Sequence, residues 1–550
     1  MREPAAAAAE FLASRATGQI TFPPHAGPYL GGIMEPTSPP AAAAATPSHR
    51  KWLWPPSLIV FISSACIMVL ELVAGRIIAP HVGVSLYTWT SVIGVVLAGI
   101  SLGNYLGGRM ADRWASPRLL GILFVLGGLA SVLVVAEDSL DIASMVEWPL
   151  ILEILLLITA LFFIPAAVLG TISPVVVKLA VHDLSRTGST VGRIYAAGSV
   201  GSIVGTFATG FLLISWFGTH LIVWGVALVL VILGLLILLG RRWLWALPAL
   251  LLLAGGSLLA SRLGWLDGPC TRETNYFCII VKDEERDGEP VRVLILDRLV
   301  HSYTSLNDPT KLVYGYERAY ADVTAYQAQR LGRLSALFIG GGGYTFPRYM
   351  EAVYPGSELD VIEIDPGVTQ VAYDSLGLQP EAHIVTYNED ARMFLAREPA
   401  RSYDLILGDA FNDFSVPYHL TTREFNDRVR AWLADDGYYV VNIIDGAWGD
   451  FLRAYTRTLR QTFRHVYLAP TISSWREASR STFVLIAGDT PLDLDALKAL
   501  DGGSSLLKQQ LLTAQETDVL LAEGRLVMLT DRYAPVDQML VPVFQNKVAR

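Results

Sequence analysis

Glycines and carboxylates follow apolar segments in the C-terminal half of the sequence, at the points where those segments end. Gly340, Gly341 and Gly342 come directly after the apolar segment 334–339, and Glu363 stands at the end of the next one. Glycine lets the backbone approach a ligand closely and turn into a helix N-terminus. A carboxylate at the end of the second strand of such a unit can accept hydrogen bonds from ribose hydroxyls. The pattern therefore predicts a site for an adenosyl nucleotide.

These residues must be positioned by strands and helices that alternate along the chain. The predicted strands are Tyr276–Val281, Val291–Leu296, Leu334–Ile339, Asp360–Ile364, His383–Tyr387, Tyr403–Leu407 and Tyr438–Ile443, with a helix around Pro347–Ala352. The first two would form a small leading sheet. The others indicate an open parallel sheet, which binds its ligands at the carboxyl ends of the strands. Asp390 and Asp409 follow two of these strands, so we expect them near Glu363.

The same segments resemble a known family. They are Leu337–Gly342, Val361–Asp365, Asn388–Ala391, Leu407–Phe411 and Pro417–Phe425. In this order they resemble the spermidine synthase (polyamine aminopropyltransferase) family, over roughly residues 270–545. With its apolar N-terminal half, the chain is most similar to the membrane-embedded bacterial branch. The resemblance implies a Rossmann-like α/β domain that acts as an S-adenosylmethionine-dependent transferase.

The resemblance also implies roles for single residues. Glu363 would hold the ribose, and Asp390 with Ala391 the adenine, of decarboxylated S-adenosylmethionine or S-adenosylmethionine, with no metal. Asp409 would orient or deprotonate an attacking amine or polyamine. The attacked carbon is already activated by its sulfonium, so the protein mainly positions and desolvates the reactants, and a carboxylate can take the proton. Residues expected to contact the second substrate are His301, Tyr314 and Asp413.

Departures from the family's pattern lie on the amine side of the site. The family's glycine motif continues with an Asp that holds the aminopropyl amine, and here Gly343 occupies that position. The family's Asp-Gly-x-x-Gln reads Asp297 to His301, and its second catalytic-loop Asp is shifted to Asp413, with Asn412 in the expected place. Two alternatives therefore remain: another S-adenosylmethionine-dependent transferase, such as a methyltransferase, or a polyamine transporter or sensor with a non-catalytic nucleotide-binding domain.

Composition separates the chain into unlike parts. Its 550 residues are too many for one ordinary core, and 52% are hydrophobic while 17% are charged. The formal net charge of −9 argues against a nucleic-acid partner, which needs a basic face. Residues 1–50 are rich in Ala and Pro without apolar periodicity and are predicted to be a disordered tail.

Apolar runs in the N-terminal half are long enough to cross a bilayer as helices. The predicted spans, about seven, are 57–76, 88–108, 119–136, 149–170, 194–215, 220–240 and 243–260. A further apolar piece, 171–182, is interrupted by Pro174 and is predicted to be a half-helix. Lys and Arg flank the runs in a way that places the N-terminus in the cytoplasm. We therefore expect a multi-pass protein of the bacterial inner membrane, in contact with the lipid bilayer.

The side of the membrane that carries the C-terminal domain stays open at this point. Seven spans would put it outside the cytoplasm, where Cys270 and Cys278 would form a disulfide. The nucleotide, however, is made in the cytoplasm. Glu71 and Glu153 fall within predicted spans, where a carboxylate is costly, so each is either a functional candidate or a structural partner for Arg76 or a helix end.

The predicted organisation has four parts. They are a disordered tail (1–50), a transmembrane helical domain (51–262), a small β region (270–332) and a Rossmann-like nucleotide-binding transferase domain (333–550). A homodimer is one possible assembly.

Overall fold

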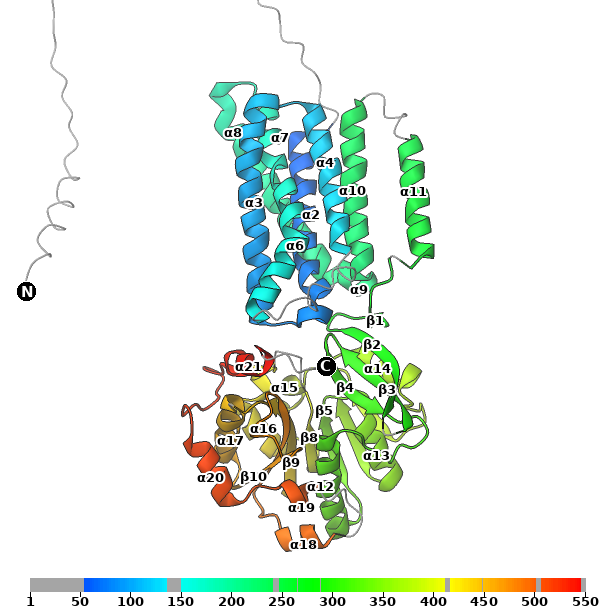
Figure 1. The fold of residues 1–550 in the computed structure, drawn as a ribbon, viewed down its shortest axis with the longest axis vertical. Coiled ribbons are helices and arrows are strands. Elements are labelled where there is room, and N and C mark those ends of the chain that lie inside the picture. Colours follow the sequence, from blue (N-terminus) through cyan, green and yellow to red (C-terminus); the bar gives the residue numbers. More distant parts are fainter. Residues whose placement is uncertain are drawn as a thin grey trace, which may run out of the picture. The chain divides into compact units, whose positions relative to one another are not determined.

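A computed structural model describes residues 54–135, 150–240, 247–264, 266–286, 288–410, 416–447, 449–500 and 506–545. The predicted tail lies outside these residues. The described chain begins with helices, from Pro56 to Arg262, and continues with two β-sheets and their covering helices (Figure 1).

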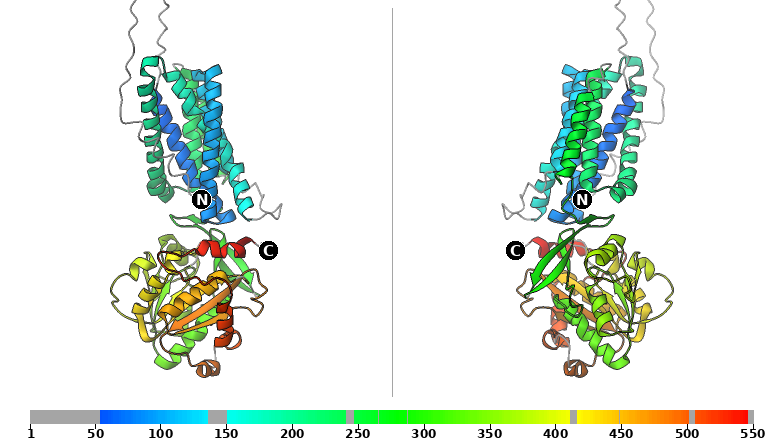
Figure 2. Two further views of the ribbon diagram at one scale, coloured as in Figure 1. Left: turned by 90° about the vertical axis from the view of Figure 1, so that its left-hand side faces the viewer. Right: turned by 90° about the vertical axis from the view of Figure 1, so that its right-hand side faces the viewer.

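The helices of the N-terminal half run side by side as a bundle (Figure 2). They are α2 (Pro56–Val82), α3 (Leu86–Trp114), α4 (Pro117–Val132), α6 (Leu150–Gly170), α7 (Ile172–Ala180), α8 (Thr187–Ala208), α9 (Ile214–Trp216), α10 (Thr219–Leu239) and α11 (Leu247–Arg262), with short turns η2 (Leu184–Arg186) and η3 (Thr209–Leu213). The expected half-helix is α7, which follows α6 directly. Pro174 lies in its first turn, where a missing N–H is tolerated.

Six helical stretches of the described chain are long and apolar enough to cross a membrane, judged by length and composition. They are Pro56–Val82, Leu86–Trp114, Pro117–Val135, Ile151–Ala180, Leu184–Trp216 and Thr219–Leu239. The seventh predicted span coincides with α11, which has 16 residues. A helix of that length is shorter than the roughly 20 residues that a bilayer core requires.

Glycines bring three pairs of these helices into backbone contact. A Cβ added at Gly201 of α8, at Gly103 of α3 or at Gly121 of α4 would lie 2.2, 2.2 or 2.8 Å from a carbonyl oxygen of α2, α6 or α10. Close approach through small residues is typical of helices that associate within membranes.

Arg76 of α2 was a candidate partner for Glu71, and the structure gives it different partners. Its guanidinium donates hydrogen bonds to the carbonyl oxygens of Thr274 and Asn275, the latter at 3.1 Å. Arg76 therefore binds the segment that leads into the first sheet.

The first sheet is antiparallel, with four strands in chain order. They are β1 (Arg272–Glu273), β2 (Cys278–Arg286), β3 (Glu289–Leu296) and β4 (Leu299–Thr304). The two predicted leading strands are β2 and β3, which pair with Ile279 opposite Leu296. Their neighbours β1 and β4 were not expected.

The second sheet has seven strands in the order β10-β11-β9-β8-β5-β6-β7. They are β5 (Ser335–Ile339), β6 (Glu358–Ile362), β7 (Ile384–Tyr387), β8 (Tyr403–Gly408), β9 (Leu433–Asp445), β10 (His465–Pro470) and β11 (Ser481–Gly488). Strands β5 to β9 are parallel, as predicted, and β11 and β10 extend the sheet in antiparallel fashion. The chain steps from β5 to β6 on one side and returns to β8 on the other, and ligands bind at such a switch point.

Helices cover both faces of this sheet (Figure 1). One face packs against α12 (Gly315–Leu331), α13 (Thr345–Val353), α14 (Pro366–Ser375), α18 (Leu494–Ala499) and α19 (Leu506–Gln510). The other packs against α15 (Ala391–Phe394), α16 (Arg423–Trp432), α17 (Asp450–Thr462), α20 (Ala514–Ala522) and α21 (Val536–Gln545). Strand β5 shows why both layers form: Phe338 points into the first core, and Leu337 and Ile339 point into the second.

Candidate active site

A cavity of about 370 Å³ opens at the carboxyl ends of β5, β6 and β8, where the strand order reverses. Most of the residues predicted from the sequence line it: Gly340, Gly342, Glu363, Asp390, Ala391, Asp409 and His301. Gly341 lines a smaller adjoining cavity. Tyr314 lines neither of these two cavities, because its hydroxyl donates to the carbonyl oxygen of Val300 at 2.9 Å. Asp413 lies outside the described residues.

The glycine loop after β5 needs residues without side chains. Gly340 has φ +97°, and a Cβ there would lie 2.7 Å from the carbonyl oxygen of Asp409. Gly342 has φ +48°, again in the region that favours glycine. The loop backbone can therefore pass close to both the strand ends and a ligand.

Glu363 is buried at the end of β6 and is oriented by backbone donors. Its Oε2 accepts a hydrogen bond from the N–H of Gly341 at 2.8 Å, and its Oε1 accepts one from the N–H of Asp365 at 2.9 Å. Burial raises the pKa of this carboxyl, and the two backbone N–H groups oppose that shift. Glu363 thus fixes the glycine loop as well as lining the cavity.

Tyr344 packs against the same loop, a role that the sequence did not predict. It is fully buried, has φ +53°, and its hydroxyl lies 3.1 Å from the hydroxyls of Thr369 and Thr386. A Cβ added at Gly341 would lie 2.7 Å from the Tyr344 ring. A left-handed backbone is uncommon for such a bulky residue, so the surrounding contacts must hold it there.

Asp390 begins the short helix α15 and forms another wall of the cavity. Its Oδ1 accepts a hydrogen bond from the N–H of Met393 at 3.0 Å, which caps the helix. Its Oδ2 lies 3.3 Å from Nε2 of His419, which also lines the cavity.

Asp409 lies just past the end of β8 and is held by two side chains. The hydroxyl of Tyr316 donates to its Oδ2 at 2.8 Å, and Nδ2 of Asn442 donates to its Oδ1 at 2.9 Å. Burial raises the pKa of Asp409 to about 6, although both hydrogen bonds lower it. A carboxylate with such a pKa is mostly ionised at neutral pH and accepts a proton readily.

Tyr316 and Asn442 were missed as site residues. Asn442 was the more accessible of the two, because it is a single amide in the otherwise apolar segment 438–443. Tyr316 had no comparable signal, since α12 carries several tyrosines and the sequence does not say which of them faces β8.

The segment before β2 forms a further wall. Tyr276 and Phe277 line the cavity, and the disulfide between Cys270 and Cys278 closes the segment that contains them. The hydroxyl of Thr274 donates to Oδ2 of Asp365 at 2.5 Å, beside the end of β6.

The cavity is acidic. Four carboxylates line it: Glu363, Glu389, Asp390 and Asp409. Among its described lining residues none is Lys or Arg. In the described ranges of the chain, no three His, Cys, Asp or Glu side chains are grouped so that they could hold a metal ion. The arrangement suits an organic cation.

Comparison with curated proteins finds polyamine aminopropyltransferases. No family model matches the sequence. The chain is 39% identical over 108 residues to a polyamine aminopropyltransferase of Vibrio vulnificus, covering 19% of this chain and 36% of the relative. It is 25% identical over 452 residues to polyamine aminopropyltransferase 2 of Streptomyces coelicolor, covering 76% of this chain and 78% of the relative. The chain spans only about a third of the length of each of the first two relatives found, 36% of one and 29% of the other.

Methyltransferases and solved structures also match. An N-terminal histidine N-methyltransferase of Emericella nidulans is 33% identical over 149 residues, which cover 26% of this chain and 25% of the relative. The crystal structure of a probable spermidine synthase from Corynebacterium glutamicum aligns with a TM-score of 0.41 and 21% identity, over 46% of this chain and 93% of that one.

Proposed function

We propose that this chain, which resembles the polyamine aminopropyltransferases, transfers an aminopropyl group from decarboxylated S-adenosylmethionine to an amine. The lone pair of the neutral amine bonds to the carbon beside the sulfonium. The carbon–sulfur bond breaks, and its electron pair stays on sulfur, which leaves methylthioadenosine. The new ammonium gives its proton to Asp409, so the protein supplies position and a base.

The charge of the cavity is the observation that carries this proposal. Intact S-adenosylmethionine has a carboxylate in its tail, and a carboxylate out of water needs a cationic or N–H partner. The decarboxylated donor carries only positive charges, on its sulfonium and its amine. A cavity with four carboxylates and no Lys or Arg among its described walls therefore favours the decarboxylated donor and a cationic acceptor.

We propose roles for the other lining residues from the family resemblance, and their positions in the cavity support these roles. Glu363 accepts hydrogen bonds from the ribose hydroxyls, and the glycine loop covers the ribose and sulfonium. Asp390 and Ala391 hold the adenine. His301 reaches the acceptor from β4, where its Nδ1 donates to the carbonyl oxygen of Leu299 at 2.9 Å.

A methyltransferase is the second candidate, and Gly343 is the observation that favours it. The Asp that holds the aminopropyl amine in the family is absent from that position, and a methyltransferase is among the relatives. The donor would then be intact S-adenosylmethionine, and methyl rather than aminopropyl would be transferred.

For the helical half we propose insertion into the bacterial inner membrane. Six long apolar helices support this, as does the backbone contact of three helix pairs through glycine.

Mass spectrometry of the nucleotide that stays on the purified full-length protein tests the function. We expect decarboxylated S-adenosylmethionine or methylthioadenosine, and an aminopropylated product when the protein is given the donor and a panel of amines. Retained S-adenosylmethionine with a methylated product would establish the second candidate. Retained nucleotide without turnover on any amine would instead favour a transporter or sensor.

A further inference from the structure

A second cavity, of about 20 Å³, adjoins the larger one beyond Asp409. The two share Asp409, His301 and glycines of the loop. A space of this size holds one water molecule or a group of similar size, such as an ammonium. Its own walls include Glu317, Tyr316, Ser302 and Gly343.

Glu317 is a buried acid that lines this cavity. It lies in the first turn of α12, and only 2% of its surface is exposed to solvent. Its Oε2 accepts one hydrogen bond, from the N–H of Tyr314 at 3.3 Å. Burial and the negative charge of Asp409 raise the pKa of Glu317 to about 8, against the hydrogen bond from the Tyr314 N–H and the positive charge of Arg318, which lower it.

Gly343 shows why an acid cannot enter this cavity from the glycine loop. A Cβ added there would lie 2.0 Å from Oγ of Ser302 and 3.1 Å from Oγ1 of Thr304. Both hydroxyls belong to buried residues of β4. An Asp at position 343 would therefore clash with β4, whereas Glu317 reaches the same cavity from α12.

We infer that Glu317 binds the primary ammonium at the free end of the donor's aminopropyl chain. This inference rests on the proposed function and names the residue that recognises the transferred group. A primary ammonium is compact and has three N–H donors, which a carboxylate at the end of a small cavity can accept. Asp409, which lies between the two cavities, is then left to the acceptor amine. The arrangement selects donors whose tail ends in a cation.

Glu317→Gln tests the inference because Gln keeps the size and the cap of α12 but removes the charge. Two ligands are titrated calorimetrically into the full-length protein: decarboxylated S-adenosylmethionine, and methylthioadenosine, which lacks the ammonium. We expect affinity for the first to fall by roughly 10- to 100-fold, as for a lost hydrogen bond to a charged group. Affinity for methylthioadenosine should stay within about twofold of wild type. Equal losses for both ligands, or no loss for either, would overturn the inference.

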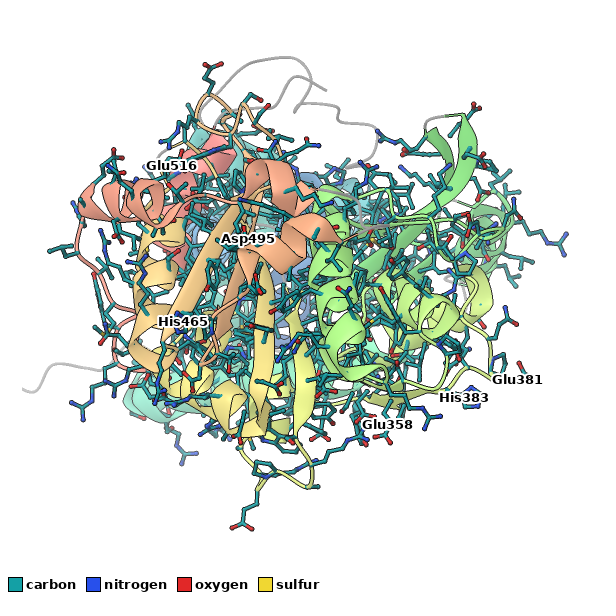
Figure 3. All side chains as sticks on the ribbon, turned by 90° about the horizontal axis from the view of Figure 1, so that it is seen from below. Glu358, Glu381, His383, His465, Asp495 and Glu516 are labelled. Carbon is teal, nitrogen blue, oxygen red and sulfur yellow. A yellow bond between two sulfur atoms is a disulfide. The ribbon has the colours of Figure 1, made fainter. Side chains whose placement is uncertain are left out.

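Glu516→Gln is the matched control. Glu516 holds the same third position in α20, where its Oε2 accepts from the N–H of Thr513 at 2.8 Å. It is exposed, and Figure 3 shows it on α20 at the periphery of the molecule. This variant should bind both ligands as the wild type does.

Proton release gives a readout that a merely structural role would not produce. In the empty cavity at pH 7, Glu317 is mostly protonated, and an arriving ammonium favours its ionised form. Binding of the donor should therefore release close to one proton, measured as the dependence of binding heat on buffer ionisation. Glu317→Gln should abolish that release. Unchanged release in the variant would contradict the assignment.

A carboxylate placed at position 343 tests whether the donor affinity lost in Glu317→Gln can be restored from the glycine loop. Ser302→Gly removes the side chain that blocks Gly343, so Ser302→Gly/Gly343→Asp can present an acid to the same cavity. Added to Glu317→Gln, this pair should recover at least part of the lost donor affinity. Failure of the inference also differs from failure of the function: a wild type that transfers no aminopropyl group refutes the function, whereas an active wild type with an equally active Glu317→Gln refutes only the inference.

Discussion

Asp409 is the residue on which the proposed chemistry depends most. Asp409→Asn keeps the shape and most of the hydrogen bonding but removes the base. We expect the transfer rate to fall by roughly 100-fold or more, the scale typical of a positioned base. Nucleotide affinity, measured by calorimetry, should change little. A folded variant that turns over at the wild-type rate would remove Asp409 from the mechanism.

The same residue sets a pH dependence. The pKa of Asp409 is raised to about 6, and only its ionised form can take a proton. An acidic limb near pH 6 should therefore appear in kcat/KM, in addition to the rise with pH that deprotonation of the attacking amine itself produces. In Asp409→Asn this acidic limb should be missing from the residual rate. A limb that persists in the variant would belong to another group.

Glu363 is expected to act on binding rather than on rate. Glu363→Ala removes a charged acceptor for two ribose hydroxyls, at about 1.5–3 kcal/mol for each hydrogen bond. It also frees the N–H of Gly341, so the glycine loop should become less ordered. Titration with methylthioadenosine should show the weaker binding, while thermal unfolding reports whether the domain stays folded. Unchanged affinity would place Glu363 outside the site.

At the residue scale, the sequence predicts those site residues that lie just after strands of the parallel sheet. Glu363, Asp390 and Asp409 were predicted to lie together because each follows a recognisable strand of one parallel sheet, and all three line the cavity. The partners of Asp409 come from 93 and 33 residues away, on α12 and β9, and such long-range pairs leave no local pattern. Gly343 indicated that the amine side of the site departs from the family's pattern, but the buried position of Glu317 depends on the packing of α12 against β8.

Among the elements, the segment between Cys270 and Cys278 connects the disulfide to the cavity wall. Reduction, or Cys270→Ser/Cys278→Ser, should loosen Tyr276 and Phe277 without touching the strand ends. Ordering about one residue again on binding would cost about 1–2 kcal/mol, so nucleotide affinity should drop roughly 5- to 30-fold. Titration with and without reductant measures this. A Cys66→Ser variant serves as control, because Cys66 is a buried thiol of α2.

The strands of the parallel part of the large sheet were predicted, whereas β4 and the two antiparallel strands were not, although β11 is strongly apolar. Strands β5 to β9 combine apolar cores with glycine or acidic ends. By contrast, β4 reads Leu-Val-His-Ser-Tyr-Thr, and its buried side chains include those of Ser302 and Thr304, so it lacks the usual alternation of buried apolar and exposed polar residues. The antiparallel β10 and β11 lie beyond the family motifs, and long-range pairing fixes their place: β11 pairs with β9, and β10 pairs with β11.

At the scale of the whole molecule, the disulfide predicts on which side of the membrane the C-terminal half lies. The structure joins Cys270 to Cys278, and such a bond persists in an oxidising compartment. We therefore expect the half that carries the candidate site outside the cytoplasm. With a cytoplasmic N-terminus this requires an odd number of spans, so α11 would have to cross the bilayer despite its 16 residues, which local thinning of the bilayer can accommodate. Membrane-impermeant labelling of Cys substituted at exposed Glu381, in intact and permeabilised cells, reports the side. Alkylation without reductant reports the two native thiols.

The two results should agree. An external domain with its cysteines bonded supports the prediction. Labelling of Glu381→Cys only after permeabilisation would give the six-span arrangement instead, with this half in the cytoplasm, where the disulfide would not be expected to last.

The glycine contacts of the bundle bear on how the protein would behave once extracted from lipid. Helices α2 with α8, α3 with α6, and α4 with α10 touch through their backbones, so a detergent chain has no room between the members of a pair. Contacts between different pairs depend more on larger side chains, which detergent can replace. Harsh solubilisation should therefore separate one helix pair from another before it separates the two helices within a pair. Purification would then pass through a partly loosened state that is still helical.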